Sequence, residues 1–136
     1  MNSRERVLAA INRQEPDRVP IDLGGTAATG IVVNSYLRLK QAYGLPTDCV
    51  RVFDVFGMMA MVEPDLIECA GADVMLVPSL CPRFGIRIDR WRQWQLRDGT
   101  EVKVPQDFRA EEQPDGSLLL MVDGSLSRDF RGRDSF

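Results

Sequence analysis

Two aspartates and a glycine-rich segment are the residues of this 136-residue chain whose types and spacing could support chemistry. Asp22 lies in a short apolar run, residues 19–23, and Gly24, Gly25 and Thr26 follow that run directly. Glycines after an apolar strand let a ligand approach the backbone closely, and sites gather at the C-terminal ends of strands in α/β units. We therefore expect the glycine segment to line a small-molecule site, and Asp22 is a candidate catalytic carboxylate. A tight turn without a ligand is the alternative.

Asp54, in the segment RVFDVF, is the second candidate catalytic carboxylate. The three-residue spacing of Arg51 and Asp54 favours a helix, although the β-branched and aromatic residues around them are also typical of a strand. On a helix, pairing with Arg51 or a capping role is the alternative to catalysis for Asp54.

The absence of histidine narrows the possible chemistry. Histidine is the usual proton-transfer group near neutral pH and the commonest nitrogen ligand for metals. A Ser-His-Asp or Cys-His nucleophile and a histidine-based zinc site are therefore excluded within these residues. Cys49, Cys69 and Cys81 show no C-x₂-C spacing, and we expect buried thiols rather than a metal site or a disulfide. We expect no metal or cofactor bound by this chain alone.

The composition limits the partners. Apolar residues make up 44% and charged residues 27% of the chain, which is typical of a globular protein. The net charge of −3 and the pI near 5.0 argue against a nucleic-acid partner. No apolar run reaches the ~20 residues that span a bilayer, and the charged N-terminus lacks a signal region. We expect no membrane partner and a cytoplasmic location.

The elements that position these residues begin with a helix. Asn2 and Glu5 form a capping-box pair, and Pro16 is expected to end the helix because the residue before a proline avoids helical angles. Apolar residues on one face, among them Ile11, predict that this helix packs on an apolar surface.

Two further helices and a second strand are expected before residue 78. The first of these two further helices begins near Asn34 and ends at Gly44, and the second begins at Pro64 and ends at Gly71. The run Asp73–Val77 then predicts a second buried strand, so residues 1–78 hold helices and the first strands of an α/β fold.

Residues 85–124 have the period of an antiparallel β excursion. Residues 97–99 fit a three-residue hairpin loop that places Trp94 opposite Val102, and residues 114–116 repeat the device before Leu118–Val122. Both tryptophans are expected in the core of this sheet, with ligand stacking as the alternative.

The last residues, 125–136, are polar and arginine-rich, and we expect them to be disordered. A sheet that ends abruptly in a charged tail suggests truncation or an altered reading frame. We therefore expect one partial domain, residues 1–124, followed by this tail.

The order of these segments resembles a known family. SRERVLAAINRQEPDRVPIDLGG is similar to the N-terminus of the uroporphyrinogen decarboxylase (URO-D) superfamily, in its methyltransferase-like branch of corrinoid-dependent methyltransferases. LKQAYGLP, VRVFD, AGADVMLV and W-x-x-W-x-L-x-DGTEVKVP continue the similarity over about residues 1–124. The tail does not fit the family.

The resemblance implies the first part of a (β/α)₈ barrel, which needs ~200 to over 400 residues. Relatives either decarboxylate a porphyrinogen without a cofactor or transfer methyl groups with a corrinoid protein, often with zinc. The zinc ligands of the methyltransferases lie in later strands. The decarboxylases hold substrate carboxylates with two arginines, and Gly25 and Thr29 stand at those positions, which argues against porphyrinogen decarboxylation.

Three functions remain open. The chain is expected to be a partial methyltransferase-like protein that is inactive alone, with a small-molecule substrate or a corrinoid protein as partner. A decarboxylase-like lyase that uses Asp22 or Asp54 is the second possibility. A non-enzymatic remnant or interaction module, which self-associates through unpaired strand edges, is the third.

Overall fold

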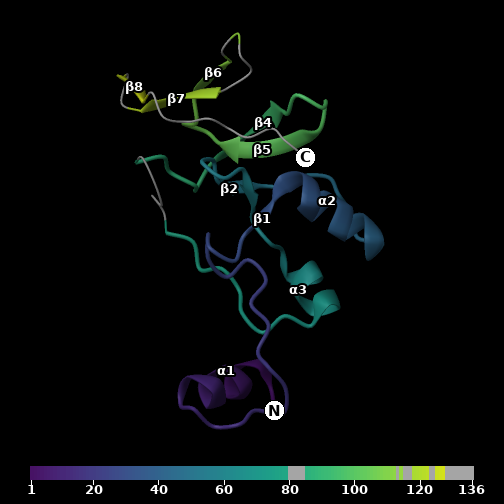
Figure 1. Ribbon diagram of the computed structural model, residues 1–136. Helices are drawn as coiled ribbons and strands as arrows, with labels where there is room; N and C mark the ends of the chain where they lie inside the picture. The colour runs from purple at the N-terminus through teal and green to yellow at the C-terminus, as the bar shows by residue number, and fades with distance from the viewer. Residues whose placement is uncertain (80–84, 113, 115–117, 123–124, 128–136) are drawn as a thin grey trace. The chain divides into compact units, whose positions relative to one another are not determined.

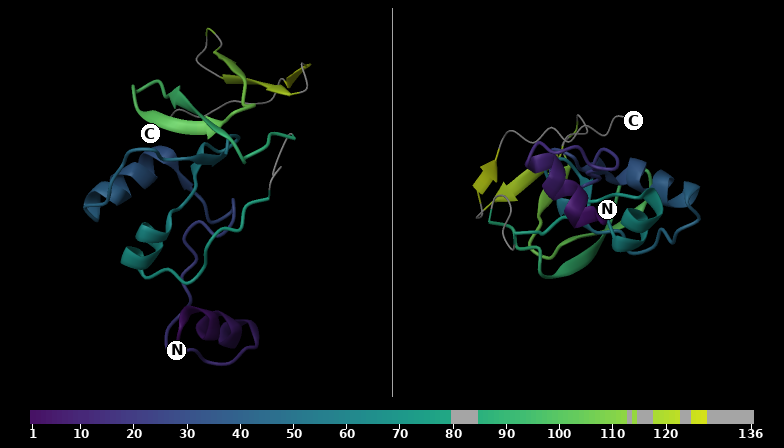
Figure 2. Two further views of the ribbon diagram at one scale, coloured as in Figure 1. Left: turned by 180° about the vertical axis from the view of Figure 1, so that it is seen from behind. Right: turned by 90° about the horizontal axis from the view of Figure 1, so that it is seen from below.

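The computed structural model describes residues 1–79, 85–112, 114, 118–122 and 125–127, and in these it contains three helices and eight short strands (Figure 1). The chain divides into two compact units, one made of Met1–Thr47 and Ala60–Val77 and the other of Asp48–Met59 and Pro78–Phe136. The expected mixed α/β class with small antiparallel sheets is confirmed, and Figure 2 follows the same chain from two further sides.

Helix α1 (Ser3–Ile11) begins at the predicted capping box, but its buried face is made of other residues than predicted. The Asn2 side chain accepts a hydrogen bond from the Glu5 amide, and the Glu5 carboxylate accepts one from the Asn2 amide, each at 2.9 Å. The prediction that α1 packs through an apolar face that includes Ile11 is wrong, because Arg6 and Ala9 are buried whereas Ile11 is 71% exposed. The helix also ends well before Pro16.

Helices α2 (Val33–Ala42) and α3 (Pro64–Ala70) end where the sequence predicts. Gly44 has a φ of +67°, and Leu45 donates to the Lys40 carbonyl at 2.9 Å, which closes α2 in a Schellman-type end. Pro64 opens α3, and Gly71, with a φ of +64°, ends it. α2 starts slightly earlier than expected, directly after the two-residue strand β1 (Ile31–Val32).

The two apolar runs expected as buried strands pair at one position. Asp22 and Val74 form an isolated parallel bridge, and the Asp73 amide donates to the Ile21 carbonyl at 2.8 Å. The expected burial is wrong, since Val19 is 79% and Val77 is 87% exposed. Among the described residues of this unit, no further strand extends the pairing, so the flanking apolar side chains remain in contact with solvent.

Asp54 lies on a strand, and the expected helix around it is wrong. β2 (Val52–Asp54) is buried along its length and precedes β3 (Met59–Ala60), its neighbour in a short sheet. The preceding segment pairs with residues far along the chain, because Lys103 donates to the Val50 carbonyl at 2.7 Å. This long-range pairing overrides the local helical spacing.

The expected hairpin is confirmed in β4 (Trp91–Gln95) and β5 (Glu101–Pro105), which pair antiparallel with Trp94 opposite Val102. Gly99, with a φ of +84°, lies in the connecting turn. Phe108 is fully buried and meets the Trp94 ring edge-on, with centroids 5.4 Å apart. Trp94 therefore contributes to the sheet core, as expected.

A second antiparallel sheet has the order β6-β7-β8, formed by Ala110–Glu112, Leu118–Val122 and Ser125–Ser127. The expected strand at Leu118–Val122 is confirmed, whereas the loop residues 115–116 lie outside the described residues. The expected disorder of the tail is wrong at Ser125–Ser127, which pairs with β7. Residues 128–136 lie outside the described part.

Candidate functional site

The glycine segment forms a loop that satisfies its own polar groups. Gly24 donates to the Thr29 carbonyl at 2.9 Å, and the Thr26 and Thr29 hydroxyls lie 3.1 Å apart. Gly25 donates to Asp22 Oδ1 at 2.7 Å. The loop therefore has a defined shape without any ligand, and it presents the exposed Asp22 and Thr26 side chains to solvent.

Both glycines are needed for packing against the protein itself. Gly24 has a φ of +80°, and a Cβ there would lie 2.4 Å from Val62 Cγ2. A Cβ at Gly25 would lie 2.6 Å from both Asp22 Oδ1 and Val74 Cγ1. These contacts explain the glycines as a tight turn, and they also exclude an arginine at position 25 unless its neighbours move.

The two candidate catalytic carboxylates belong to different units. Asp22 lies with Gly24, Gly25 and Thr26 in the first unit, and its second oxygen has no hydrogen-bond partner among the described residues. Asp54 belongs to the second unit and is 7% exposed. Its carboxylate accepts from the amides of Phe56 at 2.9 Å and of Gly57 at 3.4 Å, so it closes the turn after β2.

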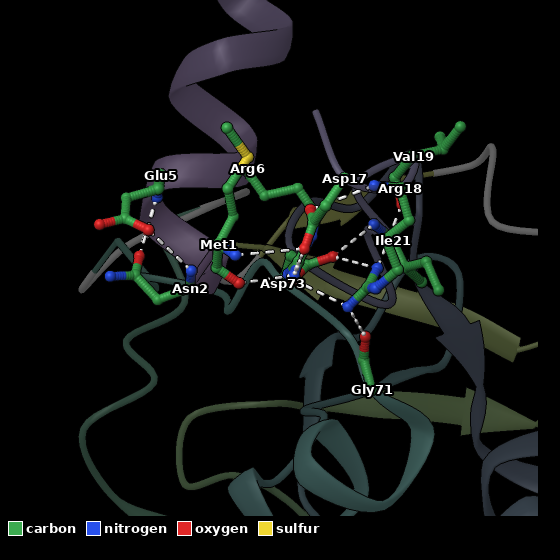
Figure 3. Close-up of polar contacts among 10 residues, drawn as sticks. All are labelled: Met1, Asn2, Glu5, Arg6, Asp17, Arg18, Val19, Ile21, Gly71 and Asp73. Carbon is green, nitrogen blue, oxygen red and sulfur yellow. Dashed lines mark hydrogen bonds and ion pairs between the residues drawn. The ribbon is translucent and has the colours of Figure 1, made fainter. Parts of the chain in front are cut away.

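Asp73, a buried carboxylate that sequence analysis did not single out, contacts Ile21, which precedes Asp22 at the base of the glycine loop (Figure 3). The Asp73 side chain is fully buried and forms ion pairs with Arg6 and Arg18. Its Oδ2 also accepts from the Ile21 amide at 2.9 Å. Arg6 in addition holds Asp17 in a bidentate pair at 2.7 and 2.9 Å.

The cluster is closed by main-chain groups and by the N-terminal amine. Arg18 donates to the Gly71 carbonyl at 2.9 Å, and Arg6 donates to the Met1 carbonyl at 2.8 Å. The Met1 ammonium lies 3.3 Å from the Asp17 carboxylate. In the sequence, Arg6 has charged neighbours in Arg4 and Glu5, and no local pattern on α1 marks it as the residue that turns inward.

These contacts shift the protonation equilibria. The hydrogen bond from Arg6 holds the pKa of Asp17 well below its usual range. The Ile21 amide, followed by Ser3 and the two arginines, does the same to the pKa of Asp73. The hydrogen bond to Asp17 raises the pKa of Arg6. The cluster is therefore charged at neutral pH and serves as an ionic clasp, not as a proton donor or acceptor.

A second buried cation joins α2 to α3. Lys40 is 2% exposed in its side chain, and its Nζ lies 2.6 Å from Glu63 Oε2 and 3.2 Å from Asp65 Oδ2. Tyr36 accepts from the Glu63 amide at 3.0 Å. Burial lowers the pKa of Lys40, but the hydrogen bond to Glu63 and the neighbouring groups outweigh it, so the pKa is raised. A lysine held charged in this way cannot act as a nucleophile at neutral pH.

The cysteines depart from expectation, because Cys49 and Cys69 are exposed free thiols, and Cys81 lies outside the described residues. Cys49 has a φ of +65° in a turn, which leaves its side chain outside the core. Within the described part of the chain, no group of three or more cysteine, aspartate or glutamate residues could hold a metal ion. None of the described helices is both long and apolar enough to cross a membrane.

Comparisons with protein-family models, with curated proteins and with solved structures find no match. The likeness to the URO-D superfamily therefore stays a prediction from the sequence.

Proposed function

We propose that this chain supplies the first part of a barrel of the URO-D superfamily, in the methyltransferase-like branch, and that it is inactive alone. The parallel bridge between Asp22 and Val74 carries the proposal. Adjacent parallel strands joined by a helical crossover are the repeating unit of a (β/α)₈ barrel, and α2 and α3 lie between these two residues in the chain. The glycine loop then follows the first strand at the end where barrel enzymes place their sites.

Position 25 supports the methyltransferase-like branch over the decarboxylases. An arginine that grips a substrate carboxylate needs room for a side chain, but a Cβ at Gly25 would lie 2.6 Å from Asp22 Oδ1 and from Val74 Cγ1. The loop offers hydroxyls and the Asp22 carboxylate in place of positive charge. This chemistry favours a neutral or cationic ligand over a polycarboxylate.

The described residues do not fit a zinc site. Zinc takes thiolate, imidazole and carboxylate ligands, and the loop provides one carboxylate and two hydroxyls. In this proposal a methyl-donating substrate or the corrinoid of a partner protein meets the loop at Asp22, Gly24, Gly25 and Thr26. Residues outside this chain supply any zinc and complete the reaction.

The proposal is tested by titrating the ¹⁵N-labelled chain with methylcobalamin and, separately, with a tetracarboxylate porphyrin. Methylcobalamin is expected to shift the amide resonances of Gly24, Gly25 and Thr26, and the porphyrin is not. Thr26→Ala is expected to weaken the response, whereas Thr47→Ala, the matched control, leaves it unchanged.

Two results would contradict the proposal. Porphyrin binding at the loop without methylcobalamin binding would favour the lyase alternative. Methyl transfer from methylcobalamin to a thiol by the chain alone would disprove the proposed inactivity.

An interaction module is the second candidate function, and the exposure of the two apolar runs favours it. Val19 and Val77 are 79% and 87% exposed, and Met75 is 56% exposed. Apolar strands with unpaired edges are templates for pairing with another chain. In this candidate the partner is a second copy of the chain.

A further inference from the structure

Asp73 clamps the residue that precedes Asp22 from two directions. Its carboxylate accepts from the Ile21 amide at 2.9 Å, and its own amide donates to the Ile21 carbonyl at 2.8 Å. The next residue on each side forms the parallel bridge, which joins Asp22 to Val74. The clamp therefore sets the register at the base of the glycine loop.

The register in turn sets the shape of the loop. Gly25 donates to Asp22 Oδ1 at 2.7 Å, and the backbone at Gly25 lies against both Asp22 and Val74 so closely that a Cβ would clash with each. A shift of Ile21 relative to Asp73 would move both neighbours of Gly25. The loop conformation consequently depends on the Asp73 clamp.

Helix α1 is bound to this clamp through Arg6, with Ser3 in the first turn of the same helix as a further contact of Asp73. Arg6 pairs with Asp73 and Asp17, whereas Leu8 and Ile11 on the same helix are 45% and 71% exposed. Ala9 is the buried apolar residue of α1, so apolar burial contributes little to the docking of this helix. Charge-assisted hydrogen bonds from a bidentate arginine are among the strongest polar contacts in proteins, and here they replace that burial.

Arg18 approaches the same carboxylate from the other side. It donates to both Asp73 oxygens, at 2.7 and 3.1 Å, and also to the Gly71 carbonyl. Asp73 is thus held by an arginine of the helix and by an arginine of the following segment. Removing the Arg6 contact leaves Asp73 partly compensated, which makes release of α1 possible without an unpaired buried charge.

We propose that Asp73 is the positioning residue of the glycine loop and that Arg6 couples the docking of α1 to it, so that helix and loop are ordered together and released together. The assignment of the loop to a ligand site rests on the proposed function above. The coupling itself is measured without a ligand, so the two can fail independently.

The test compares amide hydrogen exchange of the full chain in Arg6→Met with that in Arg4→Met, a matched control at an exposed position of α1. Arg6→Met is expected to speed exchange of the α1 amides and of Gly24 and Gly25 together, roughly 10- to 100-fold, the range expected for lost hydrogen bonds to charged groups. The Leu96 amide in the hairpin of the second unit is the internal reference and should not change. Arg4→Met should leave all three regions unchanged.

A second, milder variant distinguishes local release of α1 and the loop from unfolding of the whole chain. Asp17→Asn weakens one half of the Arg6 grip and retains the Arg6–Asp73 pair. It is expected to give a smaller increase that again affects α1 and the loop in equal proportion. Arg6→Lys, which keeps the charge without the bidentate geometry, should lie between wild type and Arg6→Met.

The proposal is overturned if α1 exchanges faster in Arg6→Met while the loop amides keep their protection. No change in either region would also overturn it. Loss of protection in the Leu96 reference with both Arg6→Met and Asp17→Asn would show that the cluster belongs to the global core, and it would reject a local coupling device as well.

Discussion

Gly24 leaves no room for a single added carbon. Its φ of +80° disfavours other residues, and a Cβ would lie 2.4 Å from Val62 Cγ2. Gly24→Ala is expected to lower the free energy of unfolding by about 2–4 kcal/mol, which combines left-handed strain with overpacking. Urea denaturation measures the change.

Two companion variants separate those causes. Gly71 also has a positive φ, +64°, but nothing lies within 4 Å of an added Cβ. Gly71→Ala should therefore lower the free energy of unfolding by only about 1–2 kcal/mol. Val62→Ala removes the clashing atom, so the double variant with Gly24→Ala should show a favourable coupling of about 1–2 kcal/mol. Purely additive effects would contradict the steric explanation.

The ionic clasp makes the first unit sensitive to acid. The pKa values of Asp17 and Asp73 are lowered in the folded chain, so each contributes stability that is complete above the ordinary aspartate pKa of about 3.9 and is lost as the pH falls below it. We expect the α1 amides to lose hydrogen-exchange protection as the pH falls below about 4.

Asp17→Asn is the matched variant for this pH dependence. It should be less stable than wild type at pH 7, and the difference should shrink as the pH falls, because protonation removes the same charge from wild type. A stability difference that stays constant with pH would contradict an ionic role for Asp17.

At the scale of elements, local signals predicted the capping box that begins α1, the C-terminal ends of α2 and α3, and the turn between β4 and β5. Gly44 and Gly71, predicted at helix ends, and Gly99, predicted in the hairpin loop, all have positive φ angles, and the Asn2–Glu5 capping box is formed. These features depend on neighbours within a few residues, so they can be recognised in one sequence.

Elements that depend on distant partners were not predictable in the same way. Val52–Asp54 became a strand through pairing of the adjacent segment with Lys103. α1 turned Arg6 inward because Asp17 and Asp73 provide carboxylates there. The sequence around Arg6 shows that the residue is charged, but it does not show that Arg6 pairs with a carboxylate 67 residues further along the chain.

The α2–α3 connection gives a prediction at the same scale. Lys40→Met is expected to lower the free energy of unfolding by about 2 kcal/mol, because Glu63 and Asp65 lose their shared cation while remaining partly exposed to water. Arg38→Met, on the exposed face of α2, is the control and should change stability by less than about 0.5 kcal/mol. Equal effects of the two variants, measured by urea denaturation, would contradict a structural role for the Lys40 pairs.

At the scale of the whole molecule, only the part of the candidate site formed by residues adjacent in the sequence was predicted. Asp22, Gly24, Gly25 and Thr26 lie together as their sequence proximity requires, whereas Asp54 is a turn-forming carboxylate of the other unit. The prediction that Val19–Leu23 and Asp73–Val77 are buried was wrong. Their composition is typical of strands that are buried on both faces, but composition does not show whether the atoms that bury them belong to the same chain or to another.

That uncovered surface leads to a prediction about assembly. Val19 and Val77 flank the Asp22–Val74 bridge and are 79% and 87% exposed. If a second copy covers them, sedimentation velocity should show association that increases with concentration. Lysines on strand edges block such pairing, so Val19→Lys combined with Val77→Lys should keep the chain monomeric. Ile11→Lys, which replaces another exposed apolar residue, 71% exposed and on α1, should still associate. A wild-type chain that is monomeric throughout, or an Ile11→Lys variant as monomeric as the double variant, would rule out pairing through these two runs.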